Sequence, residues 1–224
     1  MDKNSKFGVI FDMDGTLVNN AEYHKQAWIK FLEKHGIEIS VEEYHKKLFG
    51  RTSKEILSIV FDRDLTEEEK SRYTEEKEKT YREINADKIK AQPGLMKLLD
   101  SLKAEGVRMG VATSATESNL KFTLEKLGIA GYFITTTNSS EIKHSKPHPE
   151  IFLKTSENMG MEASRCLVFE DSPPGVEAAS KAGMKIIVVN PSEEDKIRKY
   201  TDHVHKDFTN IDYETLLQIM ENEK

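Results

Sequence analysis

Two aspartates stand one residue apart at the end of a short apolar segment near the start of the chain. Residues 7–17 read FGVIFDMDGTL, in which Asp12 and Asp14 follow Phe7–Phe11. Side chains two residues apart in an extended chain point the same way, so both carboxylates can face one site while Met13 turns aside. Burying carboxylates beside an apolar strand is costly. The pair therefore raises the question of what offsets its charge.

Other chemically active side chains follow later apolar segments. Two hydroxyl side chains stand at the end of segment 107–113 and just after it, and two more carboxylates stand in the same way at the end of segment 166–170. Between these segments, a lysine precedes a proline at 145–147. In a parallel α/β sheet, ligands bind beyond the carboxyl ends of the strands, so these groups are expected to converge there. The residues are Thr113, Ser114, Lys146, Glu170 and Asp171.

Four carboxylates at one edge repel each other unless a cation neutralises them. Oxygen-only ligands suit a hard divalent ion, and Mg²⁺ held by carboxylates, waters and a phosphate oxygen is the usual arrangement. A metal ion, a lysine and a hydroxyl around one anionic centre are what phosphoryl transfer requires, because that reaction depends mostly on positioning and charge neutralisation.

The elements that position these groups read as a parallel α/β sheet with helices on both faces. Helices are expected to begin near Pro93, Asn119, Pro149 and Val176, and each ends near a glycine. A last amphipathic helix is expected over Ile211–Met220. The expected strands are Phe7–Phe11, Val107–Thr113, Tyr132–Thr135, Cys166–Glu170 and Lys185–Val189.

The alternation of strand and helix is interrupted by a helical insertion. Residues 18–91 contain no convincing strand, and the patterns Ser40 with Glu43 and Thr66 with Glu69 match capping boxes. We therefore predict an α/β core of residues 1–17 and 92–224 and a helical domain of residues 18–91. The helices expected in the insertion are Ala21–Lys34, Val41–Leu48, Ser53–Phe61 and Glu67–Asn85.

Composition and net charge indicate which classes of molecule the protein binds. The 224 residues carry 33 basic and 39 acidic side chains, a formal charge of -6. This balance argues against a nucleic-acid or membrane-surface role, although a local site can still bind an anion. No apolar run is long enough to span a bilayer, and Cys166 is the only cysteine. We expect a cytoplasmic monomer whose partner is a small phosphorylated metabolite.

The segments FDMDGTL, VATSA, SKP and FEDSPPG, in this order, closely resemble the four motifs of the haloacid dehalogenase superfamily. The resemblance covers essentially the whole chain and implies a Rossmann-like core with the insertion as a cap. It implies that Asp12 is the nucleophile that forms an aspartyl-phosphate and that Asp14 is the general acid and base.

The same resemblance implies roles for the remaining motif residues. Thr113 and Ser114 would bind the transferring phosphate, and Lys146 would bridge the nucleophile and that phosphate. Mg²⁺ would be held by side chains and one backbone carbonyl. The implied metal ligands are Asp12, Glu170, Asp171 and the carbonyl of Asp14.

Within the superfamily, the cap resembles the β-phosphoglucomutase and sugar-phosphatase branch. The stretch AEYHKQAW and the pair Lys77 and Tyr81 are similar to the mutase, and GRTSKE lies where a specificity loop is expected. Lys77 could also be a solvated lysine, and the histidine of the first stretch could simply pack on the tryptophan. The implied substrate-binding residues of the cap are His24, Trp28, Arg51 and Lys77.

Departures from the mutase pattern favour a phosphatase. Mutases carry a serine–lysine–asparagine run that holds the second phosphate, but residues 115–118 here read ATES, and Glu117 would repel that phosphate. Residues 116–118 could also simply cap the following helix. Hydrolysis of a small phosphomonoester, with a sugar phosphate the favoured substrate, is therefore expected. The alternatives are a β-phosphoglucomutase, which would interconvert β-glucose 1-phosphate and glucose 6-phosphate, and a non-catalytic binding module.

Overall fold

The chain folds into two compact units in the computed structural model, which describes residues 6–48, 51–61 and 63–221. One unit comprises Met1–Asn19 and Lys90–Lys224, and the other is Asn20–Ile89. The chain leaves the first unit and returns to it at adjacent points, because Val18 forms an antiparallel bridge with Ala91. The second unit is thus inserted into a loop of the first.

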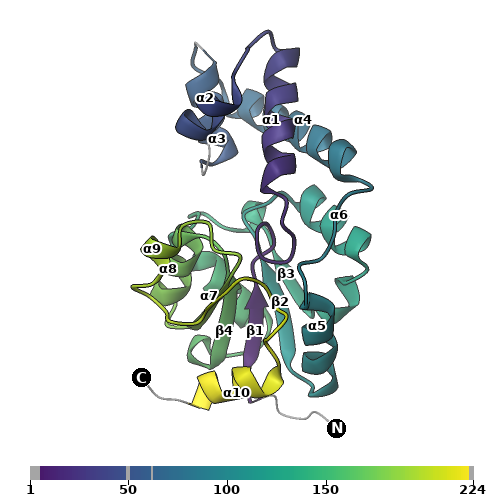
Figure 1. Ribbon diagram of the computed structural model, residues 1–224. Helices are drawn as coiled ribbons and strands as arrows, with labels where there is room; N and C mark the ends of the chain where they lie inside the picture. The colour runs from purple at the N-terminus through teal and green to yellow at the C-terminus, as the bar shows by residue number, and fades with distance from the viewer. Residues whose placement is uncertain (1–5, 49–50, 62, 222–224) are drawn as a thin grey trace. The chain divides into compact units, whose positions relative to one another are not determined.

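The first unit is built on a six-stranded sheet in the order β3-β2-β1-β4-β5-β6. Figure 1 labels the first four strands of this order. Every pair of neighbouring strands is parallel. Phe11, the last residue of β1, lies level with Val111 of β2 and Phe169 of β4, so these three strands end at one edge. The strands are β1 (Gly8–Phe11), β2 (Arg108–Ala112), β3 (Thr135–Thr137), β4 (Cys166–Glu170), β5 (Lys185–Val189) and β6 (Val204–His205).

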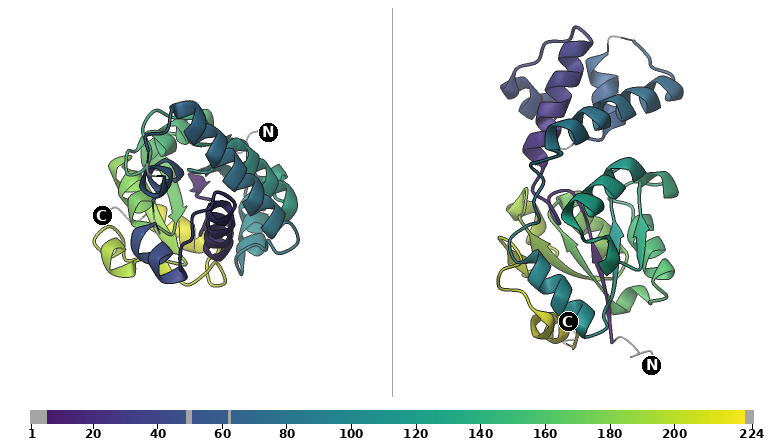
Figure 2. Two further views of the ribbon diagram at one scale, coloured as in Figure 1. Left: turned by 90° about the horizontal axis from the view of Figure 1, so that it is seen from above. Right: turned by 90° about the vertical axis from the view of Figure 1, so that its right-hand side faces the viewer.

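Helices cover both faces of this sheet, as the two further views show (Figure 2). Val9 and Phe11 belong to the apolar cluster formed with α5, α6 and α10, whereas Ile10 belongs to the cluster formed with α7, α8 and α9. This alternation follows from the period of two in a strand. The helices are α5 (Leu95–Ala104), α6 (Glu117–Leu127), α7 (Glu150–Asn158), α8 (Pro173–Lys181), α9 (Glu194–Ile197) and α10 (Tyr213–Glu221).

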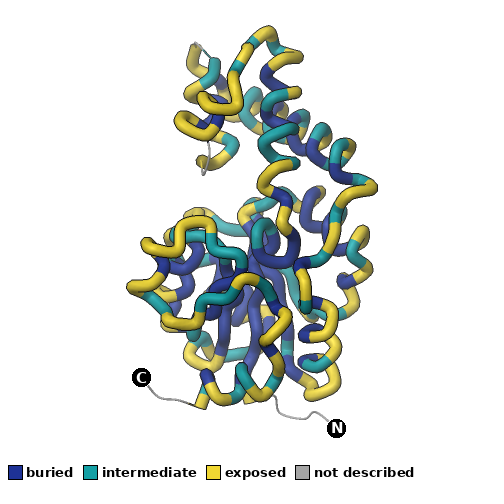
Figure 3. The backbone as a smooth tube through the Cα atoms, in the orientation of Figure 1, coloured by how far each residue is buried: buried dark blue, intermediate teal, exposed yellow. Residues whose placement is uncertain are grey.

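Helices and no strands make up the regular structure of the second unit within its described residues, and this unit has its own core (Figure 3). Phe31 and Leu32 of the first helix are buried in that core with Leu57 of the third. Both predicted capping boxes are present, and Thr52 with Glu55 forms a third. The helices are α1 (Ala21–Lys34), α2 (Val41–Lys47), α3 (Ser53–Val60) and α4 (Glu67–Asn85).

The predicted α/β fold with a helical insertion is confirmed, with a correction to the third strand. Tyr132–Thr135 was expected to be extended, but Ala130–Tyr132 forms a single 3₁₀ turn and β3 begins only at Thr135. Tyr132 packs against the first apolar cluster from this turn, which explains its apolar sequence without a strand. The short edge strand β6 was not among the expected strands. Among the described residues, no helix has the length and apolar character needed to cross a bilayer.

Candidate active site

The segment after β1 is held by hydrogen bonds to its backbone. The Asp12 amide donates to the Phe169 carbonyl at 2.9 Å, which extends the pairing of β1 with β4 by one residue. Met13 is fully buried in the first apolar cluster, as its alternation with Asp12 and Asp14 predicts. Gly15 then turns the chain with a φ of 87°, a conformation that favours glycine.

Lys146 lies between the carboxylates at the ends of two adjacent strands. Its Nζ is 2.6 Å from Asp12 Oδ1 and 2.6 Å from Glu170 Oε1. The side chains of all three residues are at least nine-tenths buried. The Lys146 Nζ also lies 4.9 Å from the centre of the Phe152 ring, a favourable cation–π distance. Residues 134 positions apart in the chain thus form one buried ionic cluster.

The second oxygen of the Glu170 carboxylate binds the start of α8. Oε2 accepts hydrogen bonds from the amides of Asp171 and Ser172 at 2.8 and 2.9 Å and from Ser172 Oγ at 3.0 Å. An anion at a helix N-terminus is stabilised by its unpaired amides. The carboxylate lies so close to Gly175 that a Cβ there would be 1.7 Å from Oε1. Gly175 is therefore required by the position of Glu170.

The donor set at this edge fits a hard divalent cation. Asp12, Glu170 and Asp171 each offer a carboxylate oxygen, and these oxygens lie within 4.8 Å of one another. Oxygen donors of this kind suit Mg²⁺, Ca²⁺ or Mn²⁺ rather than softer metals. Gly15 leaves room for the third carboxylate, because a Cβ there would lie 2.2 Å from Asp171 Oδ2. The acidic cluster therefore implies a divalent metal ion, whereas the carbonyl of Asp14 stays a predicted ligand.

The cluster changes the protonation of its members. Burial, with the nearby Glu170 charge adding to it, raises the pKa of Asp12 to about 8 although Lys146 lowers it. Burial and the charges of Glu170 and Asp12 also raise the pKa of Asp171 well above its usual value. Burial alone would lower the pKa of Lys146, but attraction to Asp12 and Glu170 raises it. A second cation would therefore displace protons from these carboxylates.

The hydroxyl motif follows β2 at the same edge of the sheet. Thr113 is buried, and its Oγ1 accepts a hydrogen bond from the Ala115 amide at 3.0 Å, whereas Ser114 is exposed. Thr116 caps α6, which confirms the capping alternative for this residue. Thr113 and Ser114 therefore lie at the expected edge, and their contact with a phosphate stays a prediction.

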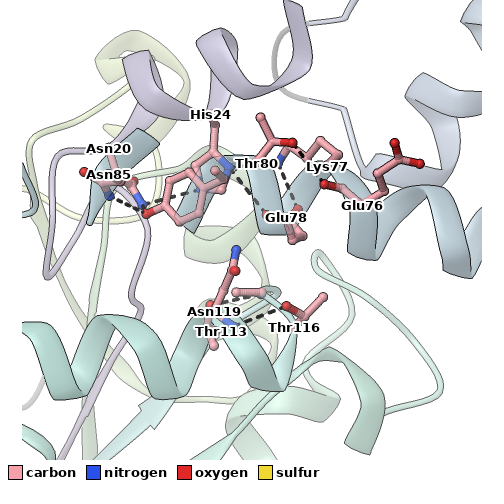
Figure 4. Close-up of polar contacts among 12 residues, drawn as sticks. Asn20, His24, Glu76, Lys77, Glu78, Thr80, Asn85, Thr113, Thr116 and Asn119 are labelled. Carbon is pink, nitrogen blue, oxygen red and sulfur yellow. Dashed lines mark hydrogen bonds and ion pairs between the residues drawn. The ribbon is translucent and has the colours of Figure 1, made fainter. Parts of the chain in front are cut away.

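The helical unit brings together three of the four predicted cap residues, of which Figure 4 shows His24 and Lys77. His24 Nδ1 lies 2.9 Å from Lys77 Nζ, which in turn lies 5.2 Å from the centre of the Trp28 ring. The His24 ring stacks on Tyr81 with ring centres 3.9 Å apart, whereas its packing on Trp28 stays an alternative. Lys77 is buried, so the solvated alternative is wrong.

Arg51 makes other contacts. Its Nε donates to the Lys47 carbonyl at 2.7 Å. Together with Lys54, Glu55, Ser58 and Ile59 it lines an open depression of the surface. Gly50, the first residue of the predicted specificity loop, lies outside the described residues. The role of Arg51 in substrate binding stays a prediction.

The structure adds supporting residues that the sequence reasoning missed. Asn190 and Gln92 donate from their side-chain amides to the Gly15 carbonyl at 2.9 and 3.1 Å and so hold the turn after Asp14. Ser172 and Gly175 could have been found, since both lie in the FEDSPPG motif. Asn190 and Gln92 lie in no motif, and only the fold brings them to Gly15.

Comparisons with known proteins agree with this geometry. Residues 9–189 match the family model described as haloacid dehalogenase-like hydrolase. A phosphorylated carbohydrates phosphatase from Thermotoga maritima is 32% identical over 183 residues, which cover 80% of this chain and 82% of that protein.

Two solved structures share the fold and more than a quarter of the aligned residues. A haloacid dehalogenase hydrolase of family IA from Entamoeba histolytica has a TM-score of 0.87 and 27% identity, covering 96% of this chain and 100% of that one. A β-phosphoglucomutase from Clostridium difficile has a TM-score of 0.79 and 27% identity, covering 95% and 96%. The chain therefore belongs to the haloacid dehalogenase-like hydrolases, in the branch with a helical cap that includes β-phosphoglucomutases and sugar phosphatases.

Proposed function

We propose that this protein is a Mg²⁺-dependent phosphatase that hydrolyses a small phosphorylated carbohydrate through an aspartyl-phosphate on Asp12. The observation that carries the proposal is the buried cluster in which Lys146 Nζ lies 2.6 Å from both Asp12 and Glu170. A lysine and carboxylates converging at the end of parallel strands can bind a phosphoryl group and a divalent ion together. The similarity to the Thermotoga phosphatase supports a carbohydrate substrate.

In the proposed first step, an Asp12 carboxylate oxygen attacks the phosphorus and the bond to the sugar oxygen breaks. Asp14 gives its proton to that leaving oxygen. Lys146 binds the phosphoryl oxygens and holds Asp12 in place, while Thr113 and Ser114 bind the phosphate at the end of β2. Asp12, Glu170, Asp171 and the Asp14 carbonyl would hold Mg²⁺, which when bound would supply positive charge that neutralises the transferring group.

In the second step, Asp14 takes a proton from water as the water oxygen attacks the phosphorus. The bond between Asp12 and phosphorus breaks, which releases inorganic phosphate and restores the Asp12 carboxylate. Residues 18–91 act as the cap, in which His24, Trp28 and Lys77 contact the sugar and Arg51 belongs to the specificity loop. Closure of a cap would exclude bulk water from the phosphoryl group. A monomeric state and a cytoplasmic location stay predictions from the sequence.

A panel of phosphate esters tests this proposal. Sugar monophosphates, nucleotides, pyrophosphate and acyl phosphates would be assayed for phosphate release with and without Mg²⁺. We expect Mg²⁺-dependent hydrolysis, fastest with sugar monophosphates, and loss of turnover in Asp12→Asn with the melting temperature retained. Absence of hydrolysis across the panel would instead support a non-catalytic binding module. Retained turnover in Asp12→Asn would contradict the assignment of the nucleophile.

A β-phosphoglucomutase is the second candidate. The similarity to the Clostridium enzyme favours it, as does the His24–Lys77 contact in the helical unit. Glu117 at the start of α6 argues against it, because an exposed carboxylate there would repel a second phosphate. A coupled assay with β-glucose 1-phosphate, primed with β-glucose 1,6-bisphosphate, separates the two. Formation of glucose 6-phosphate well above release of free phosphate would favour the mutase.

A further inference from the structure

The helical unit contains a buried ion pair between Lys77 and Glu78, and the sequence motifs gave no role to Glu78. Lys77 and Glu78 are 2% and 6% exposed, and Lys77 Nζ donates to Glu78 Oε1 at 2.8 Å. Adjacent residues of a helix do not normally face one another, so this pairing is set by the surroundings of the two side chains. A buried carboxylate beside a buried lysine removes the net charge that the lysine would otherwise contribute.

The pair fixes the hydrogen-bonding state of His24. The ammonium of Lys77 has only donors, so His24 Nδ1, at 2.9 Å, must accept. Its other ring nitrogen, Nε2, lies 3.4 Å from Asn20 Nδ2. Its orientation is fixed by stacking on Tyr81, whose hydroxyl accepts hydrogen bonds from Asn20 at 2.7 Å and from Asn85 at 3.0 Å.

The charge of Lys77 is thus compensated within the unit (Figure 4). Its Nζ contacts the Glu78 carboxylate and the His24 lone pair. It also lies 5.2 Å from the Trp28 ring centre and 5.9 Å from that of Tyr81. The Lys77 ammonium and the Glu78 carboxylate, 2.8 Å apart, cancel each other's charge within this cluster. A neutral set of donors and acceptors suits sugar hydroxyls, whereas a phosphate dianion requires uncompensated positive charge.

We propose that Glu78 is a specificity-determining residue that restricts the protein to singly phosphorylated sugars. It acts through Lys77, whose charge it cancels, so that the cluster of Lys77, Glu78 and His24 offers hydroxyl recognition and no second phosphate site. This inference rests on the proposed function, in which Lys77, His24 and Trp28 contact the part of the substrate that does not react. Glu78 would thus disfavour a second phosphate in the cap, as Glu117 is proposed to do in the core.

The test compares Glu78→Gln with Glu76→Gln. Glutamine keeps the shape and one acceptor of Glu78 but removes its charge. Glu76 is a matched control, because it lies on the same helix and also pairs with a lysine and a histidine, Lys34 and His35. Each variant would be assayed for kcat/KM with β-glucose 1,6-bisphosphate and with glucose 6-phosphate. The readout is the ratio of the two values.

We expect this ratio to rise about tenfold in Glu78→Gln, as removal of one nearby charge predicts, and to stay unchanged in Glu76→Gln. A ratio in Glu78→Gln within about twofold of the parent, or an equal rise in both variants, would overturn the proposal. Calorimetric affinities for the two sugars in an Asp12→Asn background give the same ratio without turnover. If no ester of the panel is hydrolysed, the proposed function fails while this affinity ratio still decides the role of Glu78. Binding of neither glucose phosphate would overturn the role of Glu78 and leave the panel to decide the proposed function.

Discussion

The Nζ of Lys146 lies 2.6 Å from Asp12 Oδ1, within a pair of side chains that are both buried. The same Nζ lies 2.6 Å from Glu170, so one lysine compensates two carboxylates from adjacent strands. A buried charge without its partner is far more costly than an exposed one. The lysine therefore has a structural role in addition to its proposed contact with the phosphoryl group.

Replacement of Lys146 by methionine should destabilise the protein and remove its activity. The change leaves Asp12 and Glu170 buried and uncompensated, for which we expect a loss of about 3 kcal/mol in the free energy of unfolding. Urea unfolding without Mg²⁺ measures it. Lys181→Met is the control, because the exposed pair of Lys181 with Glu177 should contribute less than about 1 kcal/mol. Equal losses in the two variants would contradict a buried cluster.

The raised pKa of Asp12 predicts a pH-dependent response to Mg²⁺. Its pKa in the folded protein is about 8, above the ordinary value of 3.8, so between these values the folded state binds more protons than the unfolded state. The contribution of Asp12 to stability is then greatest below about pH 4 and is lost as the pH rises through about 8. Mg²⁺ binds the ionised carboxylate, so the stabilisation of the folded state by Mg²⁺ should increase as the pH rises through the same range.

Thermal unfolding with and without MgCl₂, measured from about pH 5.5 to about pH 8.5, checks this dependence. The increase in melting temperature on adding MgCl₂ should be larger at the upper end. Asp12→Asn should weaken the dependence, since an amide does not titrate in this range, and leave only the part that Asp171 contributes. An increase that is the same at every pH in the parent protein would rule out a proton-linked site.

A methyl group at Gly175 should displace Glu170 and disrupt the site. The added Cβ would lie 1.7 Å from Glu170 Oε1, so the carboxylate must move away from Lys146 or from the start of α8. We expect Gly175→Ala to cost about 2 kcal/mol and to reduce kcat/KM about a hundredfold. Gly131→Ala is the control, because nothing lies within 4 Å of a Cβ there. Equal free energies of unfolding and equal kcat/KM in the two variants would refute the close contact between Gly175 and the Glu170 carboxylate.

Much of the fold could be predicted because local patterns and tertiary contacts agree. Cys166–Glu170 and Lys185–Val189 are strands with the predicted bounds, since apolar runs bounded by turn residues suit central parallel strands. The convergence of Asp12, Lys146 and Glu170 followed from the rule that ligands bind at strand ends. The capping boxes of α2 and α4 are local patterns and could be read directly.

Features that depend on tertiary packing could not be predicted. The aromatic and β-branched residues of Tyr132–Thr135 favour a strand, but Tyr132 ends a 3₁₀ turn. Pairing with β2 places β3 at Thr135–Thr137, three residues after the predicted start. Lys77 and Glu78 lie in a helix rich in charged residues, where the sequence favours solvated side chains, yet aromatic rings from α1 and α4 surround the lysine. The need for glycine at position 175 follows from the Glu170 carboxylate, which no local pattern reveals.

Chemical trapping of the intermediate tests the central claim most directly. The protein would be mixed with Mg²⁺ and its best sugar phosphate, quenched within one turnover and treated with borohydride, which reduces an aspartyl-phosphate to homoserine. We predict that mass spectrometry finds this change at Asp12 only, that it requires substrate, and that it is absent from Asp12→Asn. Modification at Asp14, or none at Asp12 during active hydrolysis, would contradict the account.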